Sequence, residues 1–454
     1  MRYSITIKSL YRKYIFIFLP LCIGTAPMLC EEQTPEVWLT IFIHGIMSVK
    51  PHLTPANFIR FIRSTVDDTV YARTVLNMRC DSYFYQNQAM QELGLRKIDP
   101  SQLTKGNASA TLAHVFETVG SFVNQNKSIE NHYYTFGWSG LVTQKHRVHD
   151  AHLLYHLLCD EIAAFAKRGI KPKIRIIGYS HGGNVCLCLA LAHNQHCPQT
   201  LIIDEAVLLG MPVQRETDYL INDPMFKRIY HIYSRKDRIQ KLDFFSTQRF
   251  FSRRIFKPRK GFTLPDKLLQ IQLKCVRENI SRTRSNKRLR AVYNMHNLAT
   301  VSGKSRYLRD ASPGHTELWF FGWTPLHYSK KFPLYPLPAA ALVPLIVKIA
   351  QNFDGKQVSE RPTLVDIRPE HELVLISNQN TQRVLTIMKF LPREELESLK
   401  TMAFKYAPDS YPEKTYRAHM LEAHKLAKEE YNAYRKKCRR RLKHQRQHAM
   451  TRAL

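Results

Sequence analysis

The stretch RIIGYSHGGN, residues 175–184, joins an apolar run to a serine with glycines on both sides. The pattern Gly-x-Ser-x-Gly, from Gly178 to Gly182, is weak evidence alone, since a chain this long contains it by chance roughly 0.1–0.2 times. Its context is more informative, because KIRII (173–177) reads as a buried strand and NVCLCLALAHN (184–194) as a small-residue helix. A strand, a sharp turn and a helix form a nucleophile elbow, which predicts Ser180 as a nucleophile.

Strand and helix patterns alternate on both sides of this turn. Apolar, β-branched runs predict strands at 37–45, 132–136, 173–177, 201–210 and 228–234, and apolar periodicity predicts a helix at 150–168 and mostly helix over 56–130. Such alternation indicates βα units. The expected fold class is therefore α/β, with a doubly wound, mostly parallel sheet, helices on both faces, and a basic, mainly helical C-terminal appendage.

The charge of the chain is strongly positive and unevenly distributed. Its 454 residues carry 68 Lys and Arg against 37 Asp and Glu, a formal net charge of +31. Most of the excess lies in 241–310 and 421–454. Dense Lys and Arg favour phosphate-bearing partners, either nucleic acid or anionic lipid, and no nucleic-acid-reading motif is present. Because the first thirty residues predict export, we expect an anionic membrane surface rather than nucleic acid.

The first thirty residues differ from the rest. A basic start is followed by the uncharged stretch 14–30, which is short for a membrane span and contains Pro20. Residues 1–30 are therefore predicted to be a signal peptide or an N-terminal membrane segment, and the protein to be exported: secreted, periplasmic or membrane-associated. The nine cysteines include no C-x-x-C pair, and neither a metal site nor a cofactor is predicted.

Six stretches resemble, in order, the α/β-hydrolases of the lipase and serine-esterase kind. They are FIHGI, FGWSG, IGYSHGGN, VLLGMPV, IYSRKDRIQ and PGHTELW. The resemblance covers residues 37–350 and implies a hydrolase catalytic domain at 36–352. Within it, the basic stretch 241–310 is expected to be an insertion that covers the site as a lid, and 353–454 a C-terminal helical basic region.

The resemblance also implies a triad in the chain order serine, acid, histidine. Asp237, just after the strand at 228–234, fits the acid, with Asp204 and Asp243 as alternatives. His315, in a Pro-Gly turn before a helix, fits the base, with His296 and His327 as alternatives.

An oxyanion hole in this fold takes one backbone N–H from the residue after the serine and another from a loop after an early strand. These positions correspond to His181 and, in the stretch HGIM, to Ile46 or Met47.

The predicted function is a serine hydrolase that cleaves carboxylic, lipid-like esters through an acyl-enzyme. Two alternatives stay open: an acyltransferase with the same machinery, and a non-catalytic binding protein that keeps the fold. The expected partner is an acyl-ester or lipid substrate, and the sequence predicts no oligomeric state.

Overall fold

The computed structural model describes most of the chain after the leader. The described residues are 35–47, 66–124, 129–196, 201–242, 252–278, 308–323, 330–353, 363–378, 384–409 and 413–452. The predicted leader at 1–30 lies outside them, as do Asp243, His296 and His327. Residues Pro35–Leu454 form one compact unit. Among the described helices, none combines the length and the apolar character that crossing a bilayer requires.

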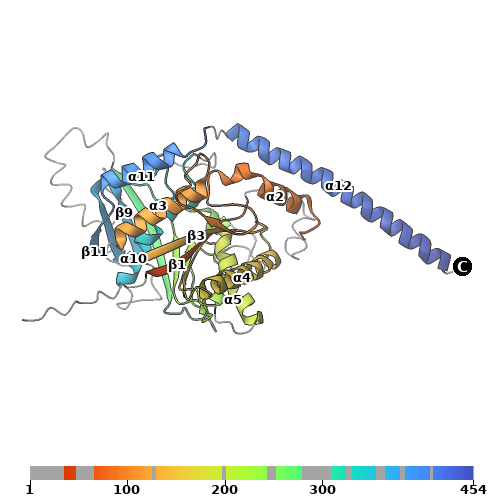
Figure 1. Cartoon of the computed structure of the whole chain (residues 1–454), viewed down its shortest axis with the longest axis horizontal. Helices are drawn as coiled ribbons and strands as arrows, with labels where there is room; N and C mark the ends of the chain where they lie inside the picture. Colours follow the sequence, from red (N-terminus) through yellow and green to blue (C-terminus); the bar gives the residue numbers. More distant parts are fainter. Residues whose placement is uncertain are drawn as a thin grey trace, which may run out of the picture. The chain divides into compact units, whose positions relative to one another are not determined.

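The centre of the described structure is one sheet of eleven strands (Figure 1). The strands are β1 (Glu36–Ile43), β2 (Gly94–Ile98), β3 (Ile129–Gly137), β4 (Lys173–Tyr179), β5 (Glu205–Leu209), β6 (Ile229–Tyr233), β7 (Leu268–Glu278), β8 (Leu308–Asp310), β9 (Thr363–Arg368), β10 (Leu373–Asn378) and β11 (Val384–Lys389). Their order is β11-β10-β9-β7-β6-β5-β4-β1-β3-β2, and β8 pairs with β7. The strands from β3 to β9 in this order are parallel, whereas β2, β8, β10 and β11 pair antiparallel.

Helices cover both faces of the sheet (Figure 1). The α-helices are α2 (Val70–Cys80), α3 (Ala108–Val123), α4 (Gln144–Ala166), α5 (His181–His196), α6 (Ile239–Leu242), α9 (His315–Trp319), α10 (Val343–Phe353), α11 (Arg393–Lys405) and α12 (Glu413–Arg452). Short 3-10 turns are η1 (Ser82–Tyr85), η2 (Asp218–Asn222), η3 (Ala339–Leu342) and η4 (Pro369–His371). Helices α4 and α5 share one apolar core with the strands, and α3, α9, α10 and α11 share the other.

Burial on both faces explains the composition of the central strands. All residues of β5 and β6 are buried, as are all but the first residue of β1. Parallel strands covered on both sides need nearly continuous apolar runs rather than an alternating pattern. The predicted α/β class with a mostly parallel sheet and helices on both faces is confirmed at this level.

Two predictions about the boundaries were wrong. The stretch 241–310 is not wholly an insertion, because β7 (268–278) lies in the middle of the sheet between β6 and β9. The region 353–454 is not a helical appendage throughout, because β9, β10 and β11 continue the same sheet. The stretch 56–130, predicted to be mostly helix, holds α2, α3 and the short strand β2 among its described residues. Polar residues concealed β7, because Gln270 and Gln272 are buried in that strand although their side chains are typical of a surface.

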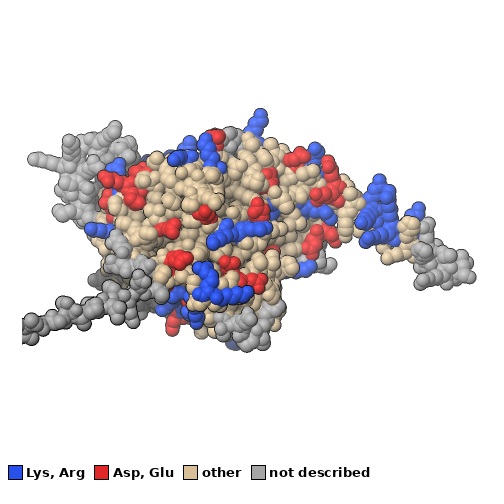
Figure 2. Space-filling model, in the orientation of Figure 1, with Lys and Arg blue, Asp and Glu red and all other residues tan. Residues whose placement is uncertain are grey.

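The long helix α12 is attached to the rest of the described structure through α2. The ring of His419 stacks on Tyr83 at 3.9 Å, and its Nδ1 lies 2.6 Å from Asp81 Oδ2. Further along, the guanidinium of Arg73 lies over the ring of Tyr434. Past this contact α12 carries a run of exposed basic side chains (Figure 2): Arg435, Lys436, Lys437, Arg439, Arg440, Arg441 and Lys443.

Candidate active site

Ser180 occupies a strained turn between β4 and α5. Its φ is 52°, in the left-handed region that L-residues rarely adopt and that costs roughly 1–2 kcal/mol. The turn is tight: a Cβ on Gly178 would lie 2.7 Å from Cα of Gly183, and one on Gly182 would collide with the carbonyls of Ile43 and His44. Gly178 and Gly182 are therefore required because neighbouring backbone atoms leave no space for a side chain. Their absence of a Cβ allows the tight turn that carries Ser180.

Two side chains from distant parts of the chain reach Ser180. His315, the first residue of α9, places Nε2 3.1 Å from Ser180 Oγ, and its Nδ1 lies 2.7 Å from Oδ2 of Asp237. With the imidazole proton on Nδ1, the imidazole donates to the carboxylate and accepts from the serine hydroxyl. The structure thus brings the three predicted triad residues into one continuous hydrogen-bonded chain.

Asp237 is fully buried just after β6. Its Oδ1 accepts the backbone N–H groups of Ile239 at 3.0 Å and Gln240 at 3.3 Å, which leaves Oδ2 for His315. Gly210, after β5, keeps this contact open, because a Cβ there would lie 3.3 Å from Asp237 Oδ2 and 2.7 Å from Leu318. The carboxylate is therefore fixed in orientation as well as in position.

Tyr179 holds the backbone of His315. Its hydroxyl donates to the carbonyl oxygen of His315 at 2.9 Å, and its ring stacks on Trp319 at 5.2 Å. Burial, and to a lesser degree the charges of Asp237 and Glu317, raise the pKa of Tyr179 well above its usual value. The hydroxyl therefore keeps its proton, and can donate it in this hydrogen bond, at alkaline as well as neutral pH. Tyr179 was not among the predicted site residues, although it adjoins Ser180.

The loop after β1 lies against the serine turn. A Cβ on Gly45 would be 3.1 Å from Cβ of Ser180, so the loop that carries Ile46 and Met47 passes directly beside the nucleophile candidate. Trp138 Nε1 donates to the carbonyl of His44 at 2.8 Å and fixes the loop. Burial, then the charge of Arg79, hold the pKa of His44 well below its usual value, so this imidazole stays neutral.

His181 is the first residue of α5 and follows Ser180 directly. Its imidazole Nδ1 accepts from Arg147 Nη1 at 2.9 Å, and Arg147 also donates to Gln144 Oε1 at 2.8 Å. The side chain is thus occupied within the protein, and the use of the His181 backbone N–H in an oxyanion hole stays a prediction. Arg147, a fully buried cation, is a second residue of the site that was not predicted from the sequence.

Asp204, the alternative acid, lies far from this arrangement along the strands. It precedes β5, where it accepts the N–H of Ile174 at 2.9 Å and pairs with Lys227 at 2.6 Å. Ile174 lies near the start of β4, whereas Ser180 directly follows its last residue, so Asp204 lies at the opposite end of the parallel strands. The reserve acid Asp243 and the reserve bases His296 and His327 lie outside the described residues.

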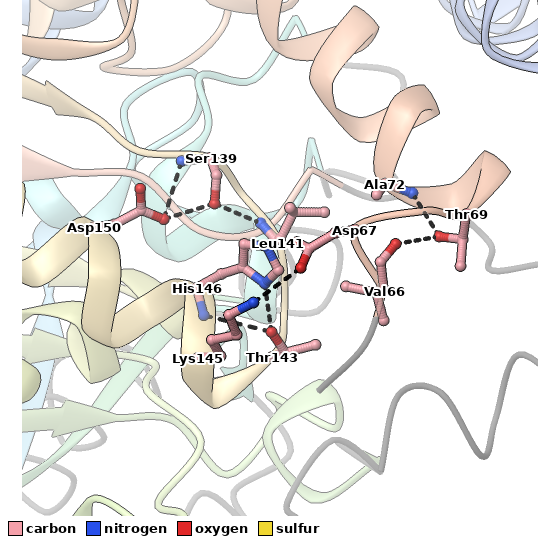
Figure 3. Close-up of polar contacts among 10 residues, drawn as sticks. All are labelled: Val66, Asp67, Thr69, Ala72, Ser139, Leu141, Thr143, Lys145, His146 and Asp150. Carbon is pink, nitrogen blue, oxygen red and sulfur yellow. Dashed lines mark hydrogen bonds and ion pairs between the residues drawn. The ribbon is translucent and has the colours of Figure 1, made fainter. Parts of the chain in front are cut away.

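A second polar cluster near the start of α4 contains hydroxyl, imidazole and carboxylate groups (Figure 3). Ser139 Oγ donates to Asp150 at 2.6 Å, and burial raises the pKa of that carboxyl. Thr143 contacts His146, whose Nε2 contacts Asp67. Burial of Asp67 favours its protonated form, but Lys145 and His146 outweigh this and lower its pKa.

This second cluster has a structural explanation. Thr143 is the N-cap of α4 with an ordinary φ of −75°, and its side chain accepts the N–H of His146. The bonds from Lys145 and His146 attach Asp67, which precedes α2, to the start of α4. In contrast to Ser180, neither Thr143 nor Ser139 stands in a left-handed turn between a strand and a helix.

Comparison with known proteins adds no family to this description. No family model matches the chain, and no curated protein matches its sequence. Any functional conclusion therefore rests on the arrangement of Ser180, His315 and Asp237 and on the groups around them.

Proposed function

We propose that the protein is a serine hydrolase that cleaves carboxylic, lipid-like esters, with Ser180 as nucleophile, His315 as base and Asp237 as the orienting acid. One observation carries the proposal: contacts of 3.1 Å and 2.7 Å link a hydroxyl, an imidazole and a buried carboxylate, and the hydroxyl belongs to a serine in a left-handed turn. A hydroxyl needs this kind of base and orienting group to attack an acyl carbon at neutral pH.

In the proposed reaction Ser180 Oγ attacks the carbonyl carbon of the ester while His315 Nε2 accepts the hydroxyl proton. The C=O electron pair moves onto oxygen, and Asp237 stabilises the imidazolium that forms. Collapse of the tetrahedral intermediate breaks the C–O bond, and the leaving alkoxide takes the proton from His315. Water, activated by the same imidazole, then releases the acid from the acyl-enzyme and restores the serine.

The negative oxygen of the intermediate needs preorganised donors. The backbone N–H of His181 and that of Ile46, or of Met47, are the proposed pair. Support comes from the close approach of the loop at Gly45 to Ser180 and from the bond between Trp138 and the His44 carbonyl, which holds that loop. Removal of one such donor usually costs about 10²–10³ in kcat.

The order of the site residues along the sheet supports the further proposal that the fold is that of the α/β-hydrolases. The nucleophile follows β4, the acid follows β6, and the base follows the strand pair β7 and β8. The exposed basic end of α12 supports an anionic membrane surface as a partner, in keeping with the predicted leader and export (Figure 2). The sequence predicts neither a metal nor a cofactor for this chemistry.

A fluorophosphonate probe tests the proposal, because it reacts with activated serines. We expect covalent labelling of the full chain, loss of labelling in Ser180→Ala, and retention in the control Ser139→Ala, with folding checked by circular dichroism. A series of p-nitrophenyl esters of increasing acyl length, assayed on the wild type and on Ser180→Ala, then defines the preferred acyl group. Absence of both labelling and hydrolysis in folded protein would overturn the proposal in favour of a non-catalytic role.

A further inference from the structure

A cavity of about 450 Å³ opens beside His315, and its wall is strongly cationic. His315 lines it together with Gly314 and Thr316. Five basic side chains also line it, against the two carboxylates of Asp310 and Glu317. The five are Lys236, Arg238, Arg277, Arg309 and Lys331.

The position of the proposed triad acid brings two of these cations to the cavity. Asp237 is fully buried, whereas its neighbours Lys236 and Arg238 are exposed, so the turn that directs the carboxylate inward directs both basic side chains outward. Lys236 Nζ donates to the carbonyl oxygen of Asp310 at 2.5 Å and lies 3.9 Å from its carboxylate. The loop after β6 is thereby joined to β8 at the cavity.

Two arginines face each other across the β7 and β8 ladder. Arg277 and Arg309 are direct partners in the antiparallel register. Directly opposite residues project on the same face with Cβ atoms about 4.5–5.5 Å apart, and like charges at such a pair are destabilising. Arg277 Nη1 donates to the carbonyl oxygen of Lys331 at 3.3 Å. This hydrogen bond gives the guanidinium an acceptor but does not balance its positive charge, because the carbonyl is neutral.

Among the described side chains, no carboxylate forms an ion pair with either arginine of this pair or with Arg238, and the carboxylate of Asp310 lies 3.9 Å from Lys236 Nζ. Two arginines placed opposite each other destabilise the fold. An anion bound between the two guanidinium groups would explain why the pair is present. Guanidinium groups bind phosphate and carboxylate oxygens in pairs, and two arginines with adjacent lysines suit such an oxyanion.

We propose that this cavity binds an anionic group, a phosphate or a carboxylate, that belongs to the ester attacked by Ser180. The inference rests on the proposed function and specifies its substrate class: esters that carry a negative charge close to the scissile bond. His315 both lines the cavity and contacts Ser180 through Nε2, so an anionic group bound in the cavity would lie close to the ester carbonyl that Ser180 is proposed to attack.

Matched esters test the proposal in the full chain. For a carboxylate on the acyl side, mono-4-nitrophenyl glutarate is compared with 4-nitrophenyl valerate, which replaces the carboxylate by a methyl group. For a phosphate on the alcohol side, monomeric dihexanoyl phosphatidic acid is compared with dihexanoyl phosphatidylcholine. We expect kcat/KM to favour the anionic member of at least one pair by about tenfold, since hydrogen bonds to charged groups contribute on this scale.

The double variant Arg277→Gln/Arg309→Gln should reduce that preference ratio by about tenfold, and rising salt should reduce it in the wild type. The control Arg393→Gln, an exposed arginine at the start of α11, should leave the ratio unchanged. Equal kcat/KM within both pairs, with Ser180-dependent hydrolysis of the neutral esters, would overturn this inference alone. No hydrolysis of any ester and no fluorophosphonate labelling would instead overturn the proposed function.

A membrane role for the cavity is the remaining outcome. If the double variant lost binding to anionic vesicles yet kept the wild-type ratio for monomeric esters, the arginines would serve the membrane surface and the substrate proposal would be wrong. Loss of the ratio without loss of vesicle binding supports the substrate proposal.

Discussion

Replacing Asp237 with Asn tests the proposed triad through the tautomer of His315. The side chain keeps its size, but one oxygen becomes an NH₂ group. In the structure the two backbone N–H groups of Ile239 and Gln240 both point at Oδ1, so the amide oxygen of Asn is required at that position. The NH₂ group must then replace Oδ2, 2.7 Å from His315 Nδ1.

An NH₂ group at this place reverses the hydrogen bond. It donates to Nδ1, which forces the imidazole proton onto Nε2, and Nε2 can then no longer accept the proton of Ser180. The variant also lacks the negative charge that stabilises the imidazolium. A loss of this kind in a serine triad lowers kcat by about 10⁴, which corresponds to roughly 5.5 kcal/mol of transition-state stabilisation.

The assay is the rate of p-nitrophenyl ester hydrolysis under saturating substrate, together with the rate of fluorophosphonate labelling. Both should fall by three to four orders of magnitude, on the order of 10³–10⁴, while circular dichroism and the thermal midpoint report a folded protein. Asp204→Asn, at the opposite end of the parallel strands, is the matched control and should keep its rate. A loss of less than tenfold in a folded Asp237→Asn protein would refute the assigned role of Asp237.

Three further predictions concern strain, acid stability and the basic helix. Gly and Ala variants are compared at Ser180 and at the exposed helical position Ser398; because of the left-handed φ at Ser180, the stability of Gly relative to Ala should be about 1 kcal/mol more favourable there than at Ser398. Urea midpoints measure the difference, and an equal penalty for Gly at both positions would contradict the strain. Burial lowers the pKa of His231 from 6.5 to about 4, so the folded protein should lose about 3 kcal/mol of stability as the pH falls from 6.5 towards 4. The variant His231→Leu should lose less stability over this pH range, and an unchanged loss would argue against His231 as the cause. Deletion of residues 435–454, which follow the contact of Arg73 with Tyr434, should weaken binding to anionic vesicles at least about tenfold and leave hydrolysis of monomeric neutral esters unchanged. Unchanged vesicle binding would exclude this end of α12 as the membrane contact.

Local signals predicted the part of the fold around Ser180. The apolar runs of β1, β4 and β6 and the glycines of the turn act over a few residues, so spacing and composition suffice to recognise them. Asp237 follows a strand and His315 precedes a helix, which are the places that the resemblance to the α/β-hydrolases implies for the acid and the base. That resemblance is why these residues were candidates before any geometry was available.

The missed strands depend on partners that the sequence does not reveal. Lys274 of β7 lies 3.4 Å from Asp366 of β9, and Arg368 lies 3.2 Å from the same carboxylate. Burial raises the pKa of Asp366, although both cations oppose this shift. Charged residues buried as a group look like surface residues when read separately, so β7 was read as part of an insertion and β9 as part of a helical region.

The site residues that escaped prediction act across long separations. Tyr179 donates to the carbonyl of a residue 136 positions away, and Arg147 reaches His181 from another helix. Neither contact leaves a local pattern. The like-charge pair Arg277 and Arg309 is likewise visible only in the register of β7 and β8, because 31 residues separate its members in the chain.

The distance along the chain between the proposed nucleophile and its proposed base has a consequence for synthesis of the protein. Ser180 is synthesised 135 residues before His315. At about 5–20 residues per second, the ribosome needs roughly 7–27 s to add the base after the serine. During that interval, and in any fragment that ends before residue 315, the hydroxyl lacks its proton acceptor. If Ser180 acts as proposed, a growing or prematurely ended chain would therefore not hydrolyse esters in the cell that makes it.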